Sequence, residues 1–341
     1  MTWREKTIHL CGGSGVTRWA IRTVCSGLYI GAMAIVIGPR ACAQSMQDAS
    51  RKFEAGSYSE AIASLQGSGQ TNSAEVEYWL GRNYYELKDY DNAVIHVEKA
   101  VALDPKNSAY HQWLGRAYGG KADRDHSFGI ARKVKKEFEE AVRLNPSNIP
   151  ARRDLEDYCL DAPWIVGGSK DEAREQVDAI TALDPIEGHL ARIALDRKDG
   201  KQDAAEKEAG EVLAAKPTHP EPYFEVASYF QATNRPDDIN SAIQGAMAVK
   251  PNDPRIGFYR GVADVLSGNA SAPHAEQSLK AYIANTPERS DWPSHASARD
   301  WLGRLYEAQG KRSEAAEQYR AALQIEPGRK DIRERLEKLS H

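Results

Sequence analysis

The residues whose side chains could do chemistry are few and irregularly spaced. Asp123, Asp125 and His126 lie close together, and Cys159 is the one cysteine after residue 43. Carboxylate, imidazole and thiol groups can bind a metal or act as base and nucleophile. The three clustered residues lack the regular spacing and the fourth partner of a metal site, so we expect a solvated turn there. A hydrolase site assembled from His126, Asp125 and Cys159 is the lesser alternative, although nothing in the sequence fixes their mutual geometry.

A second motif to test is the run Gly167-Gly168-Ser169-Lys170, which has residue types found in phosphate-binding loops. It lacks the G-x4-G-K-[ST] spacing, and Asp171 and Glu172 would repel an anion from the start of the following helix. The sequence also contains no G-x-S-x-G, H-E-x-x-H, dinucleotide-binding or paired-cysteine motif. We therefore predict that the protein is not an enzyme and that it has no cofactor and no metal. Cys159 is then expected to be a small buried helix residue rather than a reactive thiol.

The N-terminal segment has the organisation of a secretory signal peptide. Arg18 and Arg22 precede an apolar run over 24–37, and Ala41-Cys42-Ala43 supplies an A-x-A cleavage site. We predict cleavage after Ala43. The apolar run has 14 residues, fewer than the roughly 20 that a membrane-spanning helix needs. An uncleaved anchor is the alternative.

Cleavage would change the net charge of the protein. The complete chain of 341 residues has a formal net charge of −4, and residues 1–43 contain five basic residues and one acidic residue, so the charge after cleavage is −8. An acidic protein has no electrostatic reason to bind nucleic acid or anionic lipid. We predict a periplasmic or secreted protein with no nucleic-acid partner, and with membrane contact only if residues 24–37 stay attached.

An internal sequence repeat predicts the helices that must position these residues. The pattern Trp-Leu-Gly-Arg-x-Tyr occurs at 79–84, 113–118 and 301–306, and its first two copies start 34 residues apart. That period is typical of a repeating helix-turn-helix unit. Asn72 with Glu75 has capping-box spacing and predicts the start of a helix. The spacing predicts about eight helix pairs and a final capping helix over 330–341, with units at about 44–73, 74–107, 108–148, 149–185, 186–219, 220–253, 254–295 and 296–329.

Three of these units, 108–148, 149–185 and 254–295, are longer than the period, and the first two carry insertions that can be located in the sequence. We expect their extra residues, near 119–128 and 161–168, to form loops between helices, because insertions in repeats map to loops on one face. Ser169 with Glu172 predicts the start of the next helix. The tripeptide Trp164-Ile165-Val166 is apolar, and we expect it to tuck into the fold rather than to stay exposed for a partner.

The hexapeptide, followed by Ala93 and Pro105, resembles the tetratricopeptide repeat family over about 44–329. The family pattern is matched at Leu, Gly, Tyr, Ala and Pro, whereas Trp79 stands directly before Leu80, where we expect it to fill the junction between units. The two long units are also similar to a group of exported bacterial tetratricopeptide proteins. The resemblance implies an all-α, right-handed solenoid whose first helices line a concave groove that binds peptides or helices of other proteins.

The family positions whose side chains face this groove map onto nine residues: Tyr78, Arg82, Tyr85, Gln112, Arg116, Arg153, Phe224, Phe258 and Arg304. Tyr and Arg are residue types that often dominate interface energy. Arg82 and Arg116 could hold the carboxylates of an acidic peptide, or each could pair with an acid of its own scaffold, such as Glu86 for Arg82. The expected function is an exported scaffold for protein–protein or protein–peptide interaction, with a membrane-tethered envelope assembly factor as the alternative.

Overall fold

The structure is a computed structural model that describes residues 39–69, 72–268 and 273–339. The chain divides into two compact units, residues 1–37 and 38–341, and the described residues belong to the second. The apolar run predicted over 24–37 therefore lies outside the described residues. Within the described part no helix is long and apolar enough to cross a membrane.

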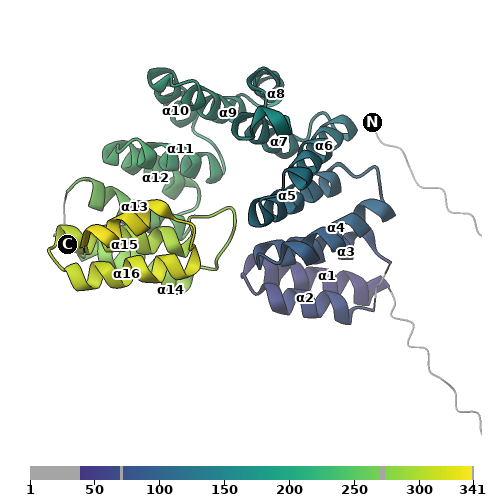
Figure 1. Ribbon diagram of the computed structural model, residues 1–341, viewed down its shortest axis with the longest axis horizontal. Helices are drawn as coiled ribbons and strands as arrows, with labels where there is room; N and C mark the ends of the chain where they lie inside the picture. Colours follow the sequence, from purple (N-terminus) through teal and green to yellow (C-terminus); the bar gives the residue numbers. More distant parts are fainter. Residues whose placement is uncertain (1–38, 70–71, 269–272, 340–341) are drawn as a thin grey trace, which may run out of the picture. The chain divides into compact units, whose positions relative to one another are not determined.

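The described residues are all-α, with no strand among them (Figure 1). The helices follow one another with short connections. They are α1 (Pro39–Glu54), α2 (Tyr58–Gly67), α3 (Ala74–Glu86), α4 (Tyr90–Leu103), α5 (Ser108–Asp125), α6 (Phe128–Leu144), α7 (Ile149–Asp161), the 3-10 turn η1 (Trp164–Val166), α8 (Lys170–Leu183), α9 (Pro185–Lys198), α10 (Gln202–Ala215), α11 (Glu221–Ala232), α12 (Pro236–Val249), α13 (Arg255–Leu266), α14 (Pro273–Asn285), α15 (His295–Ala308), α16 (Arg312–Ile325) and α17 (Lys330–Leu339).

Each odd-numbered helix from α1 to α15 packs on the helix that follows it, and each pair packs on the next. The first helices also contact one another in sequence, α3 with α5, α5 with α7, α7 with α9, α9 with α11, α11 with α13 and α13 with α15. This is the pattern of a helical repeat solenoid, in which every unit contacts mainly its neighbours. The all-α helical repeat solenoid expected from the sequence is confirmed.

The glycine of the repeated hexapeptide lets the two helices of a unit approach closely. A Cβ placed on Gly81 would lie 2.3 Å from Val97 Cγ2, and one on Gly115 would lie 2.4 Å from Phe138 Cε1. Both neighbours belong to the second helix of the same unit. Real Cβ atoms do not approach other carbon atoms so closely, so any larger residue would push the helices apart.

The tryptophan of the hexapeptide packs against the preceding unit. The Trp79 ring lies 5.4 Å from that of Phe53 on α1, in an edge-to-face arrangement. The Trp113 ring lies 5.7 Å from that of Tyr85 on α3, again edge to face. Such aromatic pairs add to the apolar area that they bury. The indole thus fills the junction between consecutive units.

The sequence predicted the capping residues of two helices, and the structure agrees with one prediction and contradicts the other. Ser169 caps α8, because its hydroxyl accepts a hydrogen bond from the Glu172 amide at 3.3 Å. Asn72 does not cap α3, and that prediction is wrong. Ser73, one residue closer to the helix, is the cap and accepts from the Val76 amide at 3.4 Å. Serine is as good a capping residue as asparagine.

The extra residues of the third unit are helical, so the predicted loop and solvated turn over 119–128 are wrong for most of that segment. Helix α5 continues to Asp125, and His126 turns the chain with a left-handed φ of 49°. Gly120 lies against Tyr90, since a Cβ there would be 2.4 Å from Tyr90 Cε1. The glycines that favoured a loop in the sequence instead allow a long helix to pass a tyrosine of the preceding unit.

The predicted cleavage point lies inside α1. Among the α1 residues whose side chains the structure describes, Ala49 and Phe53 are buried in the core, and both come after Ala43. Cleavage would therefore leave these two core residues in place. At the other end, Ile332 of α17 is completely buried, and Leu336 and Leu339 pack against the same core, which closes the last unit.

Candidate functional site

A groove runs along the first helices of the central units. Its middle is a cavity of about 490 Å³ between α5, α7, α9 and α11. A cavity of about 1180 Å³ on one side shares Arg116, Asp154 and Asp157 with it. On the other side a cavity of about 190 Å³ shares Arg153 and Glu225, and a further cavity of about 450 Å³ along α11 and α13 also includes Glu225. Because neighbouring cavities share lining residues, we treat the four as one continuous groove.

Arg116 is held by the scaffold. Its Nε and Nη2 atoms donate to the two carboxylate oxygens of Asp154 on α7, at 2.7 and 2.9 Å. The side-chain amide of Gln112 donates to the same carboxylate at 2.7 Å. A bidentate pair of this kind is strong and fixes the orientation of both groups. Arg116 and Gln112, both predicted to face a partner, therefore join α5 to α7.

Arg153 is also engaged by acids of the protein. Its Nη2 atom lies 3.1 Å from the Glu225 carboxylate on α11, and its Nε atom lies 3.8 Å from that of Glu156. Its Nη1 atom donates to the carbonyl of Glu187 at 3.5 Å. The guanidinium thus connects α7, α9 and α11 across the floor of the groove.

Arg82 and Arg304 lie outside the groove. The Arg82 guanidinium lies 4.5 Å from the ring centres of both Trp79 and Trp113 and 4.6 Å from that of Phe53. Attraction between a cation and aromatic faces stabilises this arrangement. Glu86, which we considered as a partner for Arg82, instead accepts hydrogen bonds from Ser290. Arg304 donates to Asp300 of its own helix at 2.6 Å.

The other predicted positions divide between groove and core. Tyr85 lines the largest cavity, and Phe224 and Phe258 line the cavity along α11 and α13, although both phenylalanines are almost completely buried. Tyr78 stacks near Tyr110, with ring centres 4.9 Å apart, and lines none of the four cavities. The structure therefore brings Tyr85, Arg116, Arg153, Phe224 and Phe258 to one groove and leaves out Tyr78, Arg82, Gln112 and Arg304. The role of all nine residues in partner binding stays a prediction.

The residues that the sequence prediction missed are carboxylates. The middle cavity is lined by five acidic and two basic side chains, which gives it a formal charge of −3. Among the described residues, Asp157 and Glu187 form no ion pair, whereas the two arginines are paired. Asp157 is exposed in the groove, yet desolvation by the surrounding protein raises its pKa to about 6. Desolvation also raises the pKa of Glu225, although Arg153 opposes the shift.

A signal for these acids existed in the sequence. Asp157 is the ninth residue of the unit that begins at 149, and Glu187 is the second residue of the unit that begins at 186. In the tetratricopeptide repeat family, side chains at both of these repeat positions face the groove. Apart from Gln112, the prediction named aromatic and basic residues at such positions, types that often dominate interface energy, and it passed over the acids.

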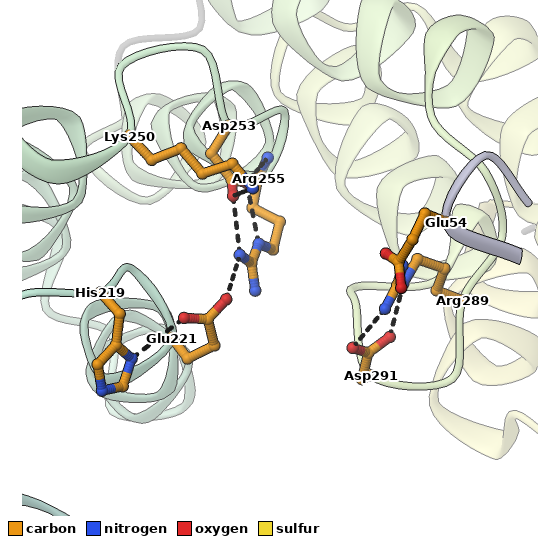
Figure 2. A network of polar contacts seen from close by, with 8 residues as sticks. All are labelled: Glu54, His219, Glu221, Lys250, Asp253, Arg255, Arg289 and Asp291. Carbon is orange, nitrogen blue, oxygen red and sulfur yellow. Dashed lines mark hydrogen bonds and ion pairs between the residues drawn. The ribbon is translucent and has the colours of Figure 1, made fainter. Parts of the chain in front are cut away.

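A loop over 286–294, between α14 and α15, contacts the first two units. Arg289 on this loop lies 2.9 Å from the carboxylate of Glu54 and 2.9 Å from that of Asp291 (Figure 2). The Tyr58 hydroxyl donates to the carbonyl of Glu288 at 2.8 Å. Pro287 packs on Gly56, where an added Cβ would lie 2.1 Å from the Cβ of the proline. No feature of the sequence indicated the contacts of this loop with the first unit, because the residues that meet are more than 200 positions apart.

The same loop forms part of the groove. Trp292 and Asp291 line the cavity along α11 and α13 together with Arg255. The Arg255 guanidinium pairs with Asp253 at 2.8 Å and with Glu221 at 3.3 Å, as Figure 2 shows. It also lies 5.0 Å from the ring centre of Trp292. This end of the groove is therefore fixed by ion pairs and by a cation over an aromatic ring.

The two long units do not assemble a recognisable active site. Cys159 is buried, and desolvation raises its pKa to about 12, so the thiol is protonated at neutral pH. Asp125 pairs with Arg124 at 2.7 Å. Among the residues that the structure describes, no group of three or more His, Cys, Asp or Glu side chains could hold a metal ion.

The apolar tripeptide of the fourth unit differs from its prediction. Val166 is buried, but Trp164 is 84% exposed and Ile165 is 53% exposed. The expectation that all three residues tuck into the fold is wrong for Trp164 and Ile165. The short 3-10 turn directs one side chain inward and leaves the other two on the surface.

Comparison with known proteins agrees with the repeat architecture. The family model of the tetratricopeptide repeat matches residues 74–107 and 296–329. No curated protein matches the sequence. The two matched segments are the units in which the hexapeptide is most complete.

Solved structures share the fold at low sequence identity. Yeast Tom70 is similar with a TM-score of 0.56 and 16% identity, over 83% of this chain and 57% of Tom70. Human IFIT1, solved as a dimer with m7Gppp-AAAA, has a TM-score of 0.55 and 18% identity, over 89% of this chain and 73% of IFIT1. The APC/C hetero-tetramer Cut9-Hcn1 has a TM-score of 0.51 and 12% identity, over 87% of this chain and 55% of the other.

This chain thus spans little more than half of the Tom70 and Cut9-Hcn1 chains. At such identities the likeness concerns the fold alone. The family model supplies the sequence evidence, and the helix pairs between α1 and α16 supply the architecture. The chain is an all-α helical repeat solenoid in which residues 74–107 and 296–329 match the tetratricopeptide repeat.

Proposed function

We propose that this protein binds an extended segment of a partner protein in the groove between α5 and α13, and that it does so without catalysing a reaction. The observation that carries the proposal is the continuous series of four cavities along the first helices, with Asp157 and Glu187 unpaired among the described residues. Concave surfaces of this kind, made by stacked repeats, are typical of protein-binding solenoids.

The charge of the groove favours a cationic segment. The sequence suggested an acidic partner because it placed arginines at groove positions. In the structure Arg116 and Arg153 already pair with Asp154 and Glu225, and the middle cavity has a formal charge of −3. An acidic segment would have to displace these pairs, whereas lysine or arginine side chains would meet free carboxylates. Complementary charge speeds encounter and selects among partners.

The same charge argues against a nucleic-acid ligand. Human IFIT1 was solved with m7Gppp-AAAA, so this fold can hold a nucleic acid. Nucleic-acid binding depends on basic side chains that neutralise phosphates. A groove with more carboxylates than guanidinium groups would repel a phosphate backbone. Cut9-Hcn1, a hetero-tetramer, is an example in which a similar fold assembles with protein partners.

We further propose that the protein is exported and cleaved after Ala43. The A-x-A site and the preceding apolar run support this, and the core residues Ala49 and Phe53 would remain in the cleaved protein. The alternative is a membrane-tethered assembly factor in which residues 24–37 are retained. The N-terminal sequence of protein isolated from the cell envelope tests this proposal, because a start before Gln44 would contradict cleavage after Ala43.

Binding can be tested with designed peptides of opposite charge. The probes are fluorescent peptides of about ten residues, long enough to span several units when extended, in which alanine alternates with lysine or with glutamate. We expect the lysine peptide to bind and the glutamate peptide not to bind, as measured by fluorescence anisotropy. The paired change Asp157→Asn and Glu187→Gln should weaken binding of the lysine peptide by about tenfold.

A matched control removes two acids outside the groove. Glu175 and Asp178 are exposed on α8, and the described part of the chain offers neither of them an ion pair. Changing them to Gln and Asn removes the same charge, so binding should stay as in the unchanged protein. Equal weakening by both double variants would show that net charge alone matters and would contradict a specific groove. Preferred binding of the glutamate peptide would restore the acidic partner predicted from the sequence.

A further inference from the structure

The largest of the four groove cavities lies where the third and fourth units meet. It has a volume of about 1180 Å³, and most of its lining comes from the second half of α5, from α6, and from the end of α7 with η1. Sites for small ligands usually measure about 300 to 1,000 Å³. This cavity, which we call the α5–α7 cavity, therefore has room for more than one side chain of a partner.

Part of the lining of the α5–α7 cavity is apolar. Val134, Phe138 and Val166 are buried and form its floor, and Phe128 at the start of α6 also lines it. The Phe128 side chain is 65% exposed. A partner side chain placed in the cavity would remove the Phe128 ring from water, and the burial of apolar surface favours binding.

Three glycines of α5 also line the cavity, and one of them has no packing role within the described structure. Gly115 makes room for Phe138, and Gly120 makes room for Tyr90. A Cβ on Gly119 would instead meet open space. Glycine inside a helix is destabilising relative to alanine, and glycine is used where a ligand must approach the backbone closely. Gly119 therefore points to a ligand that lies against α5.

The α5–α7 cavity has more acidic than basic side chains. Its lining includes five carboxylates and two guanidinium groups, so its formal charge is −3 with His126 neutral. Arg116 is bound to Asp154, and Arg124 pairs with Asp91 at 2.9 Å. Neither arginine is therefore free to attract an anion.

Two carboxylates of the cavity remain after this pairing. Asp161 and Glu326 each pair with a basic side chain that does not line the cavity, at 2.9 and 3.3 Å. Asp123 and Asp157 are exposed and form no ion pair with any residue in the described part of the chain. The charge that the cavity offers to a partner is therefore negative.

We propose that the α5–α7 cavity binds one large apolar side chain of the partner segment together with a lysine or arginine side chain beside it. The inference rests on the proposed function, because it specifies what the cationic segment presents to this part of the groove. The apolar side chain lies against Phe128 and over Gly119, and the cation meets Asp123 and Asp157. In an extended segment, residues two positions apart lie on the same side, so the apolar and the basic residue are expected at positions i and i+2.

Charge complementarity favours this occupant over others. A purely apolar segment would cover Asp123 and Asp157 without supplying a cation, and burying unpaired charges is costly. A second copy of this protein, with its formal net charge of −4, would be repelled as a whole. A segment with adjacent apolar and basic side chains satisfies both parts of the lining.

The test uses two variants of the alternating alanine–lysine peptide, of the same length. In one peptide a central lysine is replaced by leucine, and in the other the same lysine is replaced by alanine. The two peptides have equal charge and differ by one apolar side chain. We expect the leucine peptide to bind about tenfold more tightly than the alanine peptide in fluorescence anisotropy, because the leucine side chain is buried in the cavity.

These peptides separate the inference from the proposed function. If both bind with equal affinity, the groove accepts cationic segments but the cavity takes no apolar side chain, and the inference is overturned while the proposed function stands. If neither these peptides nor the unmodified lysine peptide binds, the inference and the proposed function are both overturned.

Gly119→Leu fills the cavity from within and leaves the packing of α5 intact, since its Cβ meets open space. The advantage of the leucine peptide should fall from about tenfold to about one in this variant. Gly210→Leu is the matched control, because Gly210 is an exposed glycine inside α10 that also has open space for a Cβ and lines none of the four cavities. An advantage that persists in Gly119→Leu, or that is lost equally in both variants, would overturn the proposal.

The cationic half of the proposal is tested by Asp123→Asn. This change should weaken binding of the leucine peptide about fivefold, whereas Asp178→Asn, which removes an exposed acid of α8, should leave it unchanged. Equal weakening by the two variants would contradict the role of Asp123. Sedimentation equilibrium of the protein alone completes the test, since a dimer that Gly119→Leu abolishes would assign the cavity to a second copy and overturn the proposal.

Discussion

Glu156 provides the sharpest test of the charge arrangement beneath the groove. Its side chain is completely buried on α7, and neither carboxylate oxygen has a hydrogen-bond partner in the described part of the chain. The nearest cation is the Arg153 Nε atom, 3.8 Å away. Desolvation raises the pKa of Glu156 from 4.5 to about 8, although Arg153 opposes the shift. The folded protein therefore holds a proton on Glu156 at neutral pH.

The raised pKa makes stability depend on pH in a defined direction. Between pH 4.5 and about 8 the unfolded chain loses this proton while the folded protein keeps it. Since the folded state binds more protons, the free energy of unfolding falls as pH rises through this window and is constant above it. Each pH unit corresponds to about 1.4 kcal/mol, so the full window corresponds to a loss of at most about 5 kcal/mol.

Glu156→Gln removes the titrating group and keeps the shape of the side chain. We expect the variant to be more stable than the unchanged protein at pH 8, by about 2 to 4 kcal/mol, because the buried amide still costs part of the gain. At pH 5 the two proteins should differ by less than about 1 kcal/mol. The measurement is urea unfolding followed by circular dichroism at both pH values.

A matched control isolates the effect of burial. Glu175→Gln removes an exposed carboxylate of the neighbouring helix α8 and should leave the pH dependence as it was. Groups that titrate elsewhere contribute equally to all three proteins and cancel in the comparison. If Glu156→Gln shows the same loss of stability between pH 5 and pH 8 as the unchanged protein, the carboxyl is ionised in the folded state and the reasoning fails.

Two further predictions concern packing and reactivity. Gly115→Ala should destabilise the protein by about 1 to 3 kcal/mol, because a Cβ there would lie 2.4 Å from Phe138 Cε1. Gly119→Ala, on the same helix with open space around it, should be neutral or stabilising by up to about 1 kcal/mol in urea unfolding, and equal losses would contradict a packing role for Gly115. Cys159 should react with iodoacetamide at pH 8 far more slowly than in the unfolded chain, because burial raises its pKa to about 12, and equal rates would contradict that burial.

The repeat architecture could be predicted because it depends on short-range spacing. Gly81 and Gly115 recur at the repeat period of 34 residues, directly after Leu80 and Leu114, and the proline that ends each helix pair appears near the same period. Within one unit, the residues that pack together are close in sequence. A pattern of 34 residues therefore contains most of the information about how the two helices of a unit meet.

The extra residues of the third unit could not be interpreted in the same way. Gly119 and Gly120 are poor helix formers, so a loop was the reasonable expectation. The cost of Gly120 in a helix is offset by close packing on Tyr90, which belongs to the preceding unit. Helix propensity describes the cost of the glycine but not the packing between units that offsets this cost.

The ion pairs of the groove likewise depend on contacts between units, which the sequence of a single helix does not contain. Examination of a single helix shows which acid lies four residues from an arginine, and for Arg82 that acid is Glu86. In the folded protein the pairs that matter join Arg116 to Asp154 and Arg153 to Glu225, across 38 and 72 positions of the sequence. The first helices that carry these pairs, α5 with α7 and α7 with α11, come within reach of one another only after the units have stacked. Which carboxylates remain free for a partner is therefore a property of the stack, and the preference for a cationic segment follows from the acids left over after this pairing.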